Sequence, residues 1–441
     1  MTSWRHAVSV YRDRRVLAVL LLGFSSGLPL ALTGATLAVR LTESGVSLAD
    51  IGLFALVGVP YAVKFLWAPL VDRLPIPGMT RLFGRRRGWM LATQGALIAS
   101  LLALGAVDPA ADPWRTALFA LAVAFCSASQ DIVIDAYRVE ILDEEQYGAG
   151  AAMVQFGYRI AMLVSGAGAL FLATAVSWPL VYAAMAGLVG IGVLTVLFNP
   201  EPPAPPVPTT APAMGGISHR AATWLRDAVI EPFAEMIRRN GAAVLAILAF
   251  VILYKLGDAL AGVMANPFYL MMGFSKAEIA SVSKLFGFAA TILGTFLGGL
   301  IVAKAGIMRA LLLCGALQMA SNLMFAAQAA IGYDVGFLTL TIAVENLSGG
   351  MGSAAFVAYI SALCNVSYTG TQYALLSSLA VSGRTLLSAS GGFVVEAVGW
   401  VQFFVFSTVA ALPGLLLLLW MMRRFPPRPV ALPAAAPLSR G

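Results

Sequence analysis

Long apolar blocks recur through this sequence from Val16 to Met422, separated by short charged or proline-rich breaks. Most of these blocks exceed the roughly 20 residues that a helix needs to cross the hydrocarbon core of a bilayer. Hydrophobic residues make up 60% of the chain and charged residues only 11%, whereas a soluble protein carries about a quarter charged residues. The pattern predicts an all-α polytopic membrane protein.

Taking each apolar block as a helix predicts twelve transmembrane spans. The first block follows a basic N-terminal stretch and precedes many others, so we interpret it as a transmembrane helix and not as a cleaved signal peptide. The predicted spans cover residues 16–39, 48–71, 89–107, 115–137, 149–174, 178–198, 242–265, 277–302, 308–331, 335–362, 372–396 and 400–422.

Arginine placement predicts the orientation of these spans. Arginine clusters occur before the first span, after the second, between the sixth and seventh, and after the twelfth, while the opposite loops hold only Arg40, Arg115 and Lys276 beside acidic residues. Because cytoplasmic loops carry an excess of Lys and Arg, we expect both termini and the middle loop in the cytoplasm. The same clusters account for the net charge of +7 without any nucleic acid partner.

The two halves of the chain repeat each other. E-S-G-V-S-L-A-D-I (Glu43–Ile51) parallels M-M-G-F-S-K-A-E-I (Met271–Ile279), and Gln146-Tyr147 parallels Gln372-Tyr373. Arg159, followed by Ser-Gly six residues later, parallels Arg384 with the same spacing. A duplicated six-helix unit in parallel orientation, with a long middle linker, resembles the plan of the major facilitator superfamily. The fold expected is therefore two pseudo-symmetric six-helix bundles.

The middle of the chain has two parts. Residues 200–213 are too rich in proline for a regular helix and are interpreted as an extended linker. Residues 218–239 place apolar side chains at helical spacing with arginines between them, which indicates an amphipathic helix at the membrane interface. We therefore expect an N-terminal bundle over 1–198, a cytoplasmic linker over 199–241, a C-terminal bundle over 242–422, and a disordered cytoplasmic tail over 423–441.

Charged residues follow the second span in the stretch A-P-L-V-D-R-L…F-G-R-R-R-G, from Ala68 to Gly88. A carboxylate at the end of one helix and a basic cluster before the next can form ion pairs that hold the cytoplasmic face shut; alternatively, the arginines only set topology. The stretch resembles a major facilitator motif, although an insertion, P-I-P-G-M-T-R-L-F, divides it. The candidate gate residues are Asp72, Arg73, Arg85, Arg86, Arg87, Asp135 and Arg138.

Other charges fall well inside the predicted spans. A charge at the centre of a membrane helix costs about 2.5–3.5 kcal/mol on insertion scales, so such residues normally face an aqueous cavity or each other. Counting about 1.5 Å per residue, Asp131 lies roughly 10 Å from the cytoplasmic end of the fourth span. Arg159 lies at a similar depth in the fifth span, so we predict an Asp131–Arg159 pair. The set is Lys64, Asp131, Arg159, Lys255, Asp258, Glu345 and Arg384.

Asp131 and Asp135 share one helix face at i, i+4, where two ionised carboxylates repel each other. Either a cation lies between them or one is protonated part of the time. Asp131 is deeper, which makes it the better candidate for proton coupling. Asp135 lies near the boundary, close to Arg138, and is expected to help close the cytoplasmic face.

Two carboxylates of the second half are also proton-coupling candidates. Glu345 has no cation close to it in the sequence. Asp258 lies three residues after Lys255, and the two can instead simply neutralise each other. Lys255 and Arg384 are therefore treated, with Arg159, as charge partners.

Polar, aromatic and small residues close to these charges indicate a cavity of sugar or peptide size. Aromatic faces stack on sugar rings, while amides and hydroxyls hydrogen-bond their substituents. The alternative for each residue is that it packs helix against helix, as small polar residues commonly do in membranes. The cavity candidates are Ser26, Gly27, Tyr61, Lys64, Ser129, Gln130, Gln155, Tyr158, Asn266 and Asn346.

Cofactor chemistry finds little support in the sequence. The three cysteines lie in or at predicted spans without a CxxC pair, and both histidines lie outside the spans. There is no phosphate-binding loop, which argues against ATP-driven transport. We expect no cofactor, no metal and no catalytic residue, and a protein that functions as a monomer.

Several motifs are similar to those of the AmpG muropeptide permeases. They are G-F-S-S-G-L-P-L-A-L-T (Gly23–Thr33), K-F-L-W-A-P-L-V-D-R (Lys64–Arg73), F-G-R-R-R-G-W (Phe83–Trp89), A-F-C-S-A-S-Q-D-I-V-I-D-A (Ala124–Ala136), G-A-G-A-A (Gly148–Ala152) and G-Y-R-I-A-M-L-V-S-G (Gly157–Gly166). The resemblance is dense in the N-terminal half and looser in the C-terminal half. The Q-D-I-x-x-D block also resembles the related acetyl-CoA transporters.

The resemblance implies a proton-driven importer in the bacterial inner membrane. Its substrates would be N-acetylglucosaminyl-1,6-anhydro-N-acetylmuramyl peptides and their peptide-free disaccharide, recovered during peptidoglycan recycling, and in some bacteria such uptake feeds β-lactamase induction. Two alternatives stay open. One is a transporter of another bulky amphiphile, such as a CoA thioester or a pigment; the other is a membrane acyltransferase with Asp135 or Glu345 as general base.

Overall fold

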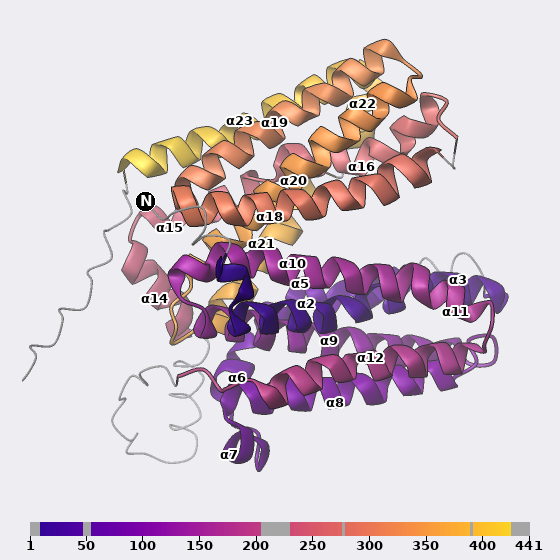
Figure 1. The fold of residues 1–441 in the computed structure, drawn as a ribbon, viewed down its shortest axis with the longest axis vertical. Coiled ribbons are helices and arrows are strands. Elements are labelled where there is room, and N and C mark those ends of the chain that lie inside the picture. The colour runs from indigo at the N-terminus through magenta and orange to yellow at the C-terminus, as the bar shows by residue number, and fades with distance from the viewer. Residues whose placement is uncertain (1–8, 47–53, 204–229, 276–277, 389–390, 425–441) are drawn as a thin grey trace, which may run out of the picture.

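The computed structural model describes residues 9–46, 54–203, 230–275, 278–388 and 391–424, and within these ranges the regular elements are all helices (Figure 1). Nine helices of the described part are long and apolar enough to cross a membrane. The remaining expected spans correspond to a broken segment over Phe54–Arg73, to the 29-residue helix Val335–Leu363, and to two helices over Thr369–Val398.

The described part of the N-terminal half consists of helices, and the sequence explains where its second span is broken. Its elements are η1 (Val10–Arg12), α2 (Arg14–Thr33), α3 (Ala35–Glu43), η2 (Phe54–Gly58), α5 (Val59–Val63), η3 (Lys64–Leu66), α6 (Ala68–Arg73), α7 (Met79–Phe83), α8 (Arg85–Ala106), α9 (Pro113–Ile141), η4 (Glu144–Gln146), α10 (Tyr147–Leu163), the π-helical η5 (Val164–Gly168), α11 (Ala169–Ala173) and α12 (Trp178–Phe198). Pro60 and Pro69 occupy the first turns of α5 and α6. A proline lacks the backbone N–H that would continue a preceding helix, so the second span is broken into short helices.

The C-terminal half starts from a helix that covers part of the predicted amphipathic segment. Its elements are α14 (Glu231–Asn240), α15 (Ala243–Leu253), α16 (Leu256–Met271), the π-helical η7 (Ile279–Phe286), α18 (Gly287–Ala305), α19 (Ile307–Ile331), α20 (Val335–Leu363), α21 (Thr369–Ser388), α22 (Gly391–Val398) and α23 (Trp400–Arg424). The rest of the predicted amphipathic helix, residues 218–229, lies outside the described residues. The seventh span breaks at Lys255, between α15 and α16.

The two halves lie side by side and meet along two sets of helices (Figure 1). On one side α10 packs against α18 and α20; on the other, α21 packs against α5, α6 and α9. Within the C-terminal half, Gly294 and Gly298 bring α18 close to α20, because a Cβ on Gly298 would lie 2.6 Å from the carbonyl oxygen of Met351. The sequence pattern Gly-x-x-x-Gly thus has its usual packing role.

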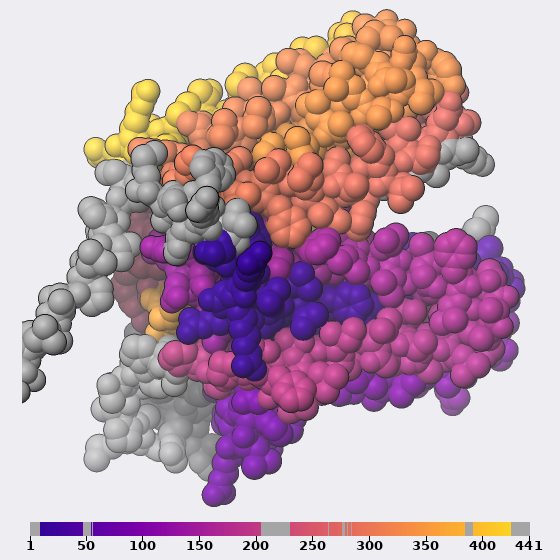
Figure 2. Space-filling view, in the orientation of Figure 1, coloured from indigo at the N-terminus to yellow at the C-terminus, as the bar shows by residue number. Residues whose placement is uncertain are grey.

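The halves touch at one end and are parted at the other. Figure 2 shows them in contact at the left of the view, and separated by a cleft at the right. We call the end at which Asp72, Arg86 and the first turn of α21 lie the closed end. The opposite end, at which α3 ends and α20 begins, is the open end.

Candidate functional site

A polar cavity of about 540 Å³ lies between the two halves. It is lined by residues of α2, α9 and α10 from the first half and of α16, α18, α20 and α21 from the second. Ten of the residues singled out from the sequence line it: Ser26, Asp131, Asp135, Gln155, Tyr158, Arg159, Lys255, Asp258, Glu345 and Asn346. Segments far apart in the chain therefore bring most of the predicted intramembrane charges to one space.

On the side of the first half, Asp131 lies at the centre of a small polar group. Ser26 Oγ donates a hydrogen bond of 2.6 Å to Asp131 Oδ1. The charged groups closest to Asp131 are Lys64 and Asp135, and Lys64 Nζ lies 3.8 Å from Asp135 Oδ2. Lys64 is thus the cation that lies near both aspartates, and it belongs to this charge group, not to the cavity lining proposed for it.

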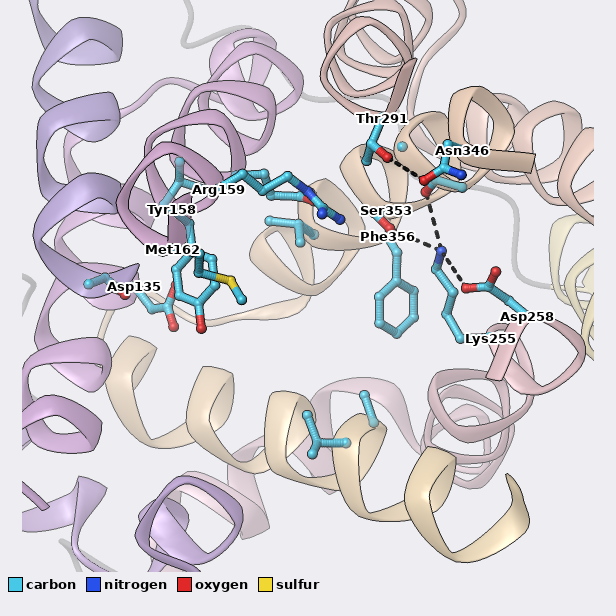
Figure 3. A pocket seen from close by; sticks show the side chains of 18 of the residues that line it. Asp135, Tyr158, Arg159, Met162, Lys255, Asp258, Thr291, Asn346, Ser353 and Phe356 are labelled. Atoms are coloured by element: carbon cyan, nitrogen blue, oxygen red, sulfur yellow. Dashed lines mark hydrogen bonds and ion pairs between the residues drawn. The ribbon is translucent and has the colours of Figure 1, made fainter. Parts of the chain in front are cut away.

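The expected Asp131–Arg159 pair is wrong. Within the described residues, Arg159 forms no ion pair with Asp131, and its nearest opposite charges are Glu345 and Asp258 of the second half. Equal depth in two neighbouring helices does not fix which way each side chain points around its helix. Figure 3 shows Arg159 extending from α10 into the cavity, away from Asp135.

On the side of the second half, Lys255 is held by several groups. Its Nζ lies 3.5 Å from Asp258 Oδ2 and donates a hydrogen bond of 3.0 Å to Ser353 Oγ (Figure 3). It also donates one of 3.0 Å to Gln318 Oε1. The predicted Lys255–Asp258 pair is therefore present. The helix break at Lys255 places this pair at the start of α16, where Asp258 lies in the first turn, a favourable position for an anion.

Glu345 lies in a second polar group on α20. Asn346 Nδ2 donates a hydrogen bond of 2.6 Å to Glu345 Oε2, and Thr291 Oγ1 donates one of 2.7 Å to Asn346 Oδ1. The other charges near Glu345 are Asp258, Lys255 and Arg159. Glu345 has no cation close to it in the sequence, but the fold brings the two cations Lys255 and Arg159 near it. The side chain of Arg384 lies outside the described residues.

Three residues predicted for the cavity instead pack helices together. Gly27 lies against α10, because a Cβ there would lie 2.9 Å from Tyr158 Cα. Ser129 Oγ donates to the carbonyl oxygen of Phe125 at 2.8 Å and accepts from Trp67 Nε1 at 3.0 Å. Gln130 is fully buried inside the first half, where Ser25 Oγ donates to its Oε1 at 3.4 Å.

Two more predicted cavity residues lie elsewhere. Tyr61 lines a separate, more apolar pocket of about 290 Å³ between the first two spans. Asn266 lies on α16, outside the lining of the central cavity. Conversely, Thr291, Ser353 and Tyr373 line the cavity and were not predicted. A single sequence does not distinguish a hydroxyl side chain that lines a cavity from the many hydroxyl side chains that pack between membrane helices.

The closed end holds a buried cluster of charges around Arg86. Arg86 Nη2 lies 2.8 Å from Asp72 Oδ1 and 2.6 Å from Glu140 Oε1, and all three side chains are almost completely buried. Arg85 adds a hydrogen bond of 2.8 Å from Nη1 to the carbonyl oxygen of Asp72 and lies 3.6 Å from Glu140. Glu140, near the end of α9, was missed in the sequence because it lies beyond the predicted span.

Asp72 also connects the two halves. Its carboxylate accepts hydrogen bonds from the backbone N–H of Gly370 at 3.2 Å and of Thr371 at 2.6 Å, and from Thr371 Oγ1 at 2.7 Å. These groups belong to the first turn of α21, where unpaired amides and the helix dipole favour a negative charge. One aspartate of the first half therefore caps a helix of the second.

Arg138 and Arg73 add cross-half contacts. Arg138 Nη2 lies 3.2 Å from Asp135 Oδ1, its Nη1 donates to Ser361 Oγ at 3.0 Å, and its guanidinium lies 5.1 Å from the ring centroid of Tyr373. Arg73 lies 4.8 Å from the ring centroid of Tyr368. Such cation–π contacts contribute about 0.5–1 kcal/mol where exposed and more where buried. Asp135 lines the cavity and takes part in this end contact as well.

The remaining arginine of the cluster and a linker glutamate have local roles. Arg87 donates to the carbonyl oxygens of Val196 at 2.9 Å and Leu197 at 3.1 Å, so these contacts stay within its own half and add no support to its predicted role in the gate. Glu201 accepts from the backbone N–H of Arg86 at 2.8 Å and of Arg87 at 2.9 Å. Glu201 thereby caps α8, although nothing in the proline-rich stretch around it predicted a fixed contact.

Comparisons with known proteins agree with this architecture. The family model described as Major Facilitator Superfamily matches residues 19–342. The anhydromuropeptide permease of Escherichia coli K12 is 42% identical over 413 residues, covering 93% of this chain and 80% of the permease. A protein of Rickettsia felis named putative transporter AmpG 4 is 34% identical over 417 residues, covering 94% of this chain and 98% of its own length.

Solved structures share the fold at low sequence identity. The human organic anion transporter MFSD10 has a TM-score of 0.63 and 16% identity, covering 95% of this chain and all of that one. The proton:xylose symporter XylE bound to 6-bromo-6-deoxy-D-glucose has a TM-score of 0.62 and 14% identity, covering 95% and 96%. Fold, cavity and relatives together define a multi-pass membrane transporter and not an enzyme. The chain belongs to the major facilitator superfamily, and within it to the family of the anhydromuropeptide permeases.

Proposed function

We propose that this protein imports N-acetylglucosaminyl-1,6-anhydro-N-acetylmuramyl peptides, and their peptide-free disaccharide, from the periplasm to the cytoplasm for peptidoglycan recycling. The observation that best supports this substrate is the 42% identity, over 93% of this chain, to a protein named anhydromuropeptide permease. A cavity lined by charged, aromatic and amide side chains from both halves is compatible with such a ligand.

The proposed transport cycle is alternating access in the bacterial inner membrane. The closed end carries Arg73, Arg81 and Arg85–Arg87, and the excess of arginine supports a cytoplasmic position for it and for both termini. The structure then corresponds to a state open to the periplasm. Two bundles, over 1–198 and 242–422, would rock about the cavity, tethered by 199–241 and followed by a tail over 423–441, and the working unit would be a monomer.

The proposed driving force is the proton gradient. Asp131 and Glu345 line the cavity from opposite halves, and each accepts one short hydrogen bond from a neutral side chain. Charged residues inside a membrane protein mark ion or proton pathways by default. Asp258 is the weaker candidate because Lys255 already lies 3.5 Å from it.

Uptake into proteoliposomes tests this proposal. We expect labelled anhydro-disaccharide peptide to accumulate only when the outside is acidic relative to the lumen, and unlabelled anhydro-disaccharide to compete while CoA does not. Protein-free liposomes serve as the control. Uptake that is indifferent both to the pH gradient and to anhydro-disaccharide would overturn the proposal, and competition by CoA instead would favour another bulky amphiphile.

A further inference from the structure

Arg159 differs from the other charged side chains that line the cavity. Within the described residues, it forms no hydrogen bond and no ion pair within 4.0 Å. The acidic groups Glu345 and Asp258 interact with it electrostatically, but from a greater distance. By contrast, Lys255 contacts Asp258, Gln318 and Ser353, and Asp135 contacts Lys64 and Arg138. Of the two cationic residues that line this cavity, Arg159 is therefore the one whose guanidinium has no partner within the part of the chain that the structure describes.

The chemistry of arginine limits what such a group can do. A guanidinium stays protonated in proteins, so Arg159 cannot become neutral in order to avoid the cost of lying inside a membrane span. Its five N–H donors lie in one plane and match the two oxygens of a carboxylate. Figure 3 shows the side chain extending into the cavity, so its donors face the space that a ligand would fill.

The rest of the cavity does not favour an anion. Four acidic residues line it, namely Asp131, Asp135, Asp258 and Glu345, against two basic ones, Lys255 and Arg159. Because Lys255 is engaged, a negatively charged ligand has one available cation to bind. Long-range attraction by the cavity as a whole would instead favour a cation, so any preference for an anion must arise at Arg159.

We propose that Arg159 binds a carboxylate of the transported ligand and makes the protein selective for ligands that carry one. The inference rests on the proposed function, which supplies ligands of this chemistry: the muramyl residue carries a lactyl carboxylate when peptide-free, and the peptide supplies carboxylates when it is present. The carboxylate-bearing end of the ligand then lies between α10 and α20, beside Glu345. The neutral sugars occupy the part of the cavity lined by Ser26 and Tyr158.

Binding to the purified full-length protein in nanodiscs, measured by calorimetry, tests the proposal with two ligands. One is the peptide-free anhydro-disaccharide, and the other is the same molecule with its lactyl carboxylate converted to the carboxamide. For the wild type we expect the acid to bind at least about tenfold more tightly than the amide, which corresponds to about 1.4 kcal/mol. For Arg159→Gln we expect affinity for the amide to persist and the acid to lose its advantage, while Arg159→Lys keeps part of it.

Arg115→Gln is the matched control, because Arg115 is exposed and lies next to Asp112 at the start of α9, outside the cavity lining. It should bind both ligands as the wild type does. Equal affinity of the wild type for acid and amide would overturn the inference while leaving the proposed function intact, as would an undiminished acid preference in Arg159→Gln. Loss of both ligands in Arg159→Gln would show a structural role and also overturn it. A wild type that binds neither ligand contradicts the proposed function itself.

Discussion

The charges of the closed end and those of the central cavity are arranged in opposite ways. At the closed end, Asp72, Arg86 and Glu140 are joined by contacts of 2.6–2.8 Å, with side chains only 1–4% exposed. In the cavity, Arg159 has no partner within 4.0 Å among the described residues, while Asp131 and Glu345 accept side-chain hydrogen bonds from the neutral groups of Ser26 and Asn346. In the first set each charge lies in direct contact with an opposite charge of the protein. The second set leaves capacity for a proton or a ligand.

Structural and functional charges in this membrane protein therefore differ in their surroundings and not in their cost of burial. Both sets are expensive to bury, and both were visible in the sequence as charges in or next to apolar blocks. A buried charge in direct contact with an opposite charge disfavours any arrangement of helices that would separate the two, because an unpaired buried charge is costly. A charge that lines a cavity and lacks partners does not stabilise any arrangement of helices, so its presence points to a role in transport.

The largest effect is expected for the two carboxylates of the cavity. Asp131→Asn and Glu345→Gln remove the proton-binding group while keeping its shape, so gradient-driven accumulation in proteoliposomes should fall to the level of protein-free liposomes. Expression and elution as a single species should match the wild type. Gradient-driven uptake at the wild-type rate by either variant would remove that residue from the proton-coupling role.

The next largest effect is expected at the closed end, on stability. Arg86→Gln leaves the carboxylates of Asp72 and Glu140 buried without their shared cation, and breaking a buried ion pair in this way costs about 3–5 kcal/mol. The midpoint of thermal unfolding of the purified protein should fall clearly. Arg115→Gln, at an exposed pair, should leave it within experimental error. Equal midpoints for the two variants would show that the cluster does not stabilise this state.

A smaller effect is expected on the balance between states. Asp72→Asn weakens both the pair with Arg86 and the cap on α21, and a charge at a helix N-terminus contributes up to about 2 kcal/mol in partly buried geometries. The halves should separate more often at the closed end, seen as a new population of long distances between spin labels placed on α6 and α21. Thr371→Val removes only the hydroxyl donor, worth about 1 kcal/mol, and should shift the distances less. An unchanged distance distribution in Asp72→Asn would refute the cross-half cap.

The smallest effect is expected for Glu201. Its carboxylate caps α8 through two backbone amides, so Glu201→Gln should lower the free energy of unfolding by about 0.3–1 kcal/mol. Uptake should stay close to that of the wild type, because the hydrogen bonds of Glu201 within the described residues connect it to Arg86 and Arg87 of its own half. A loss of uptake as complete as that of Asp131→Asn would instead connect the linker to transport.

The sequence predicted the helical fold and the identity of most buried charges, because both depend on composition along one chain. Positions around the helix axis were harder to predict. Asp131 and Arg159 were placed at the right depth for a pair, yet Arg159 points toward the charges of the second half. Lys64, expected in the cavity lining, lies instead 3.8 Å from Asp135.

Contacts made by irregular segments were predicted least well. Glu140 and Glu201 lie outside the apolar blocks, so no hydrophobic pattern marks them, although both bind the start of α8. Gly27 was assigned to the cavity because of its polar neighbours in sequence, whereas its lack of a side chain serves close packing of α2 against α10. Three-dimensional placement alone distinguishes these roles.

Proton movement caused by the substrate is the most direct test of proton coupling through the cavity carboxylates. Proteoliposomes that contain a pH-sensitive dye in the lumen, with no imposed gradient, are mixed with the anhydro-disaccharide peptide. We expect the lumen of wild-type liposomes to become acidic as substrate enters, and Asp131→Asn and Glu345→Gln liposomes to show no such change. Substrate entry without acidification of the wild-type lumen would contradict proton coupling through the cavity charges.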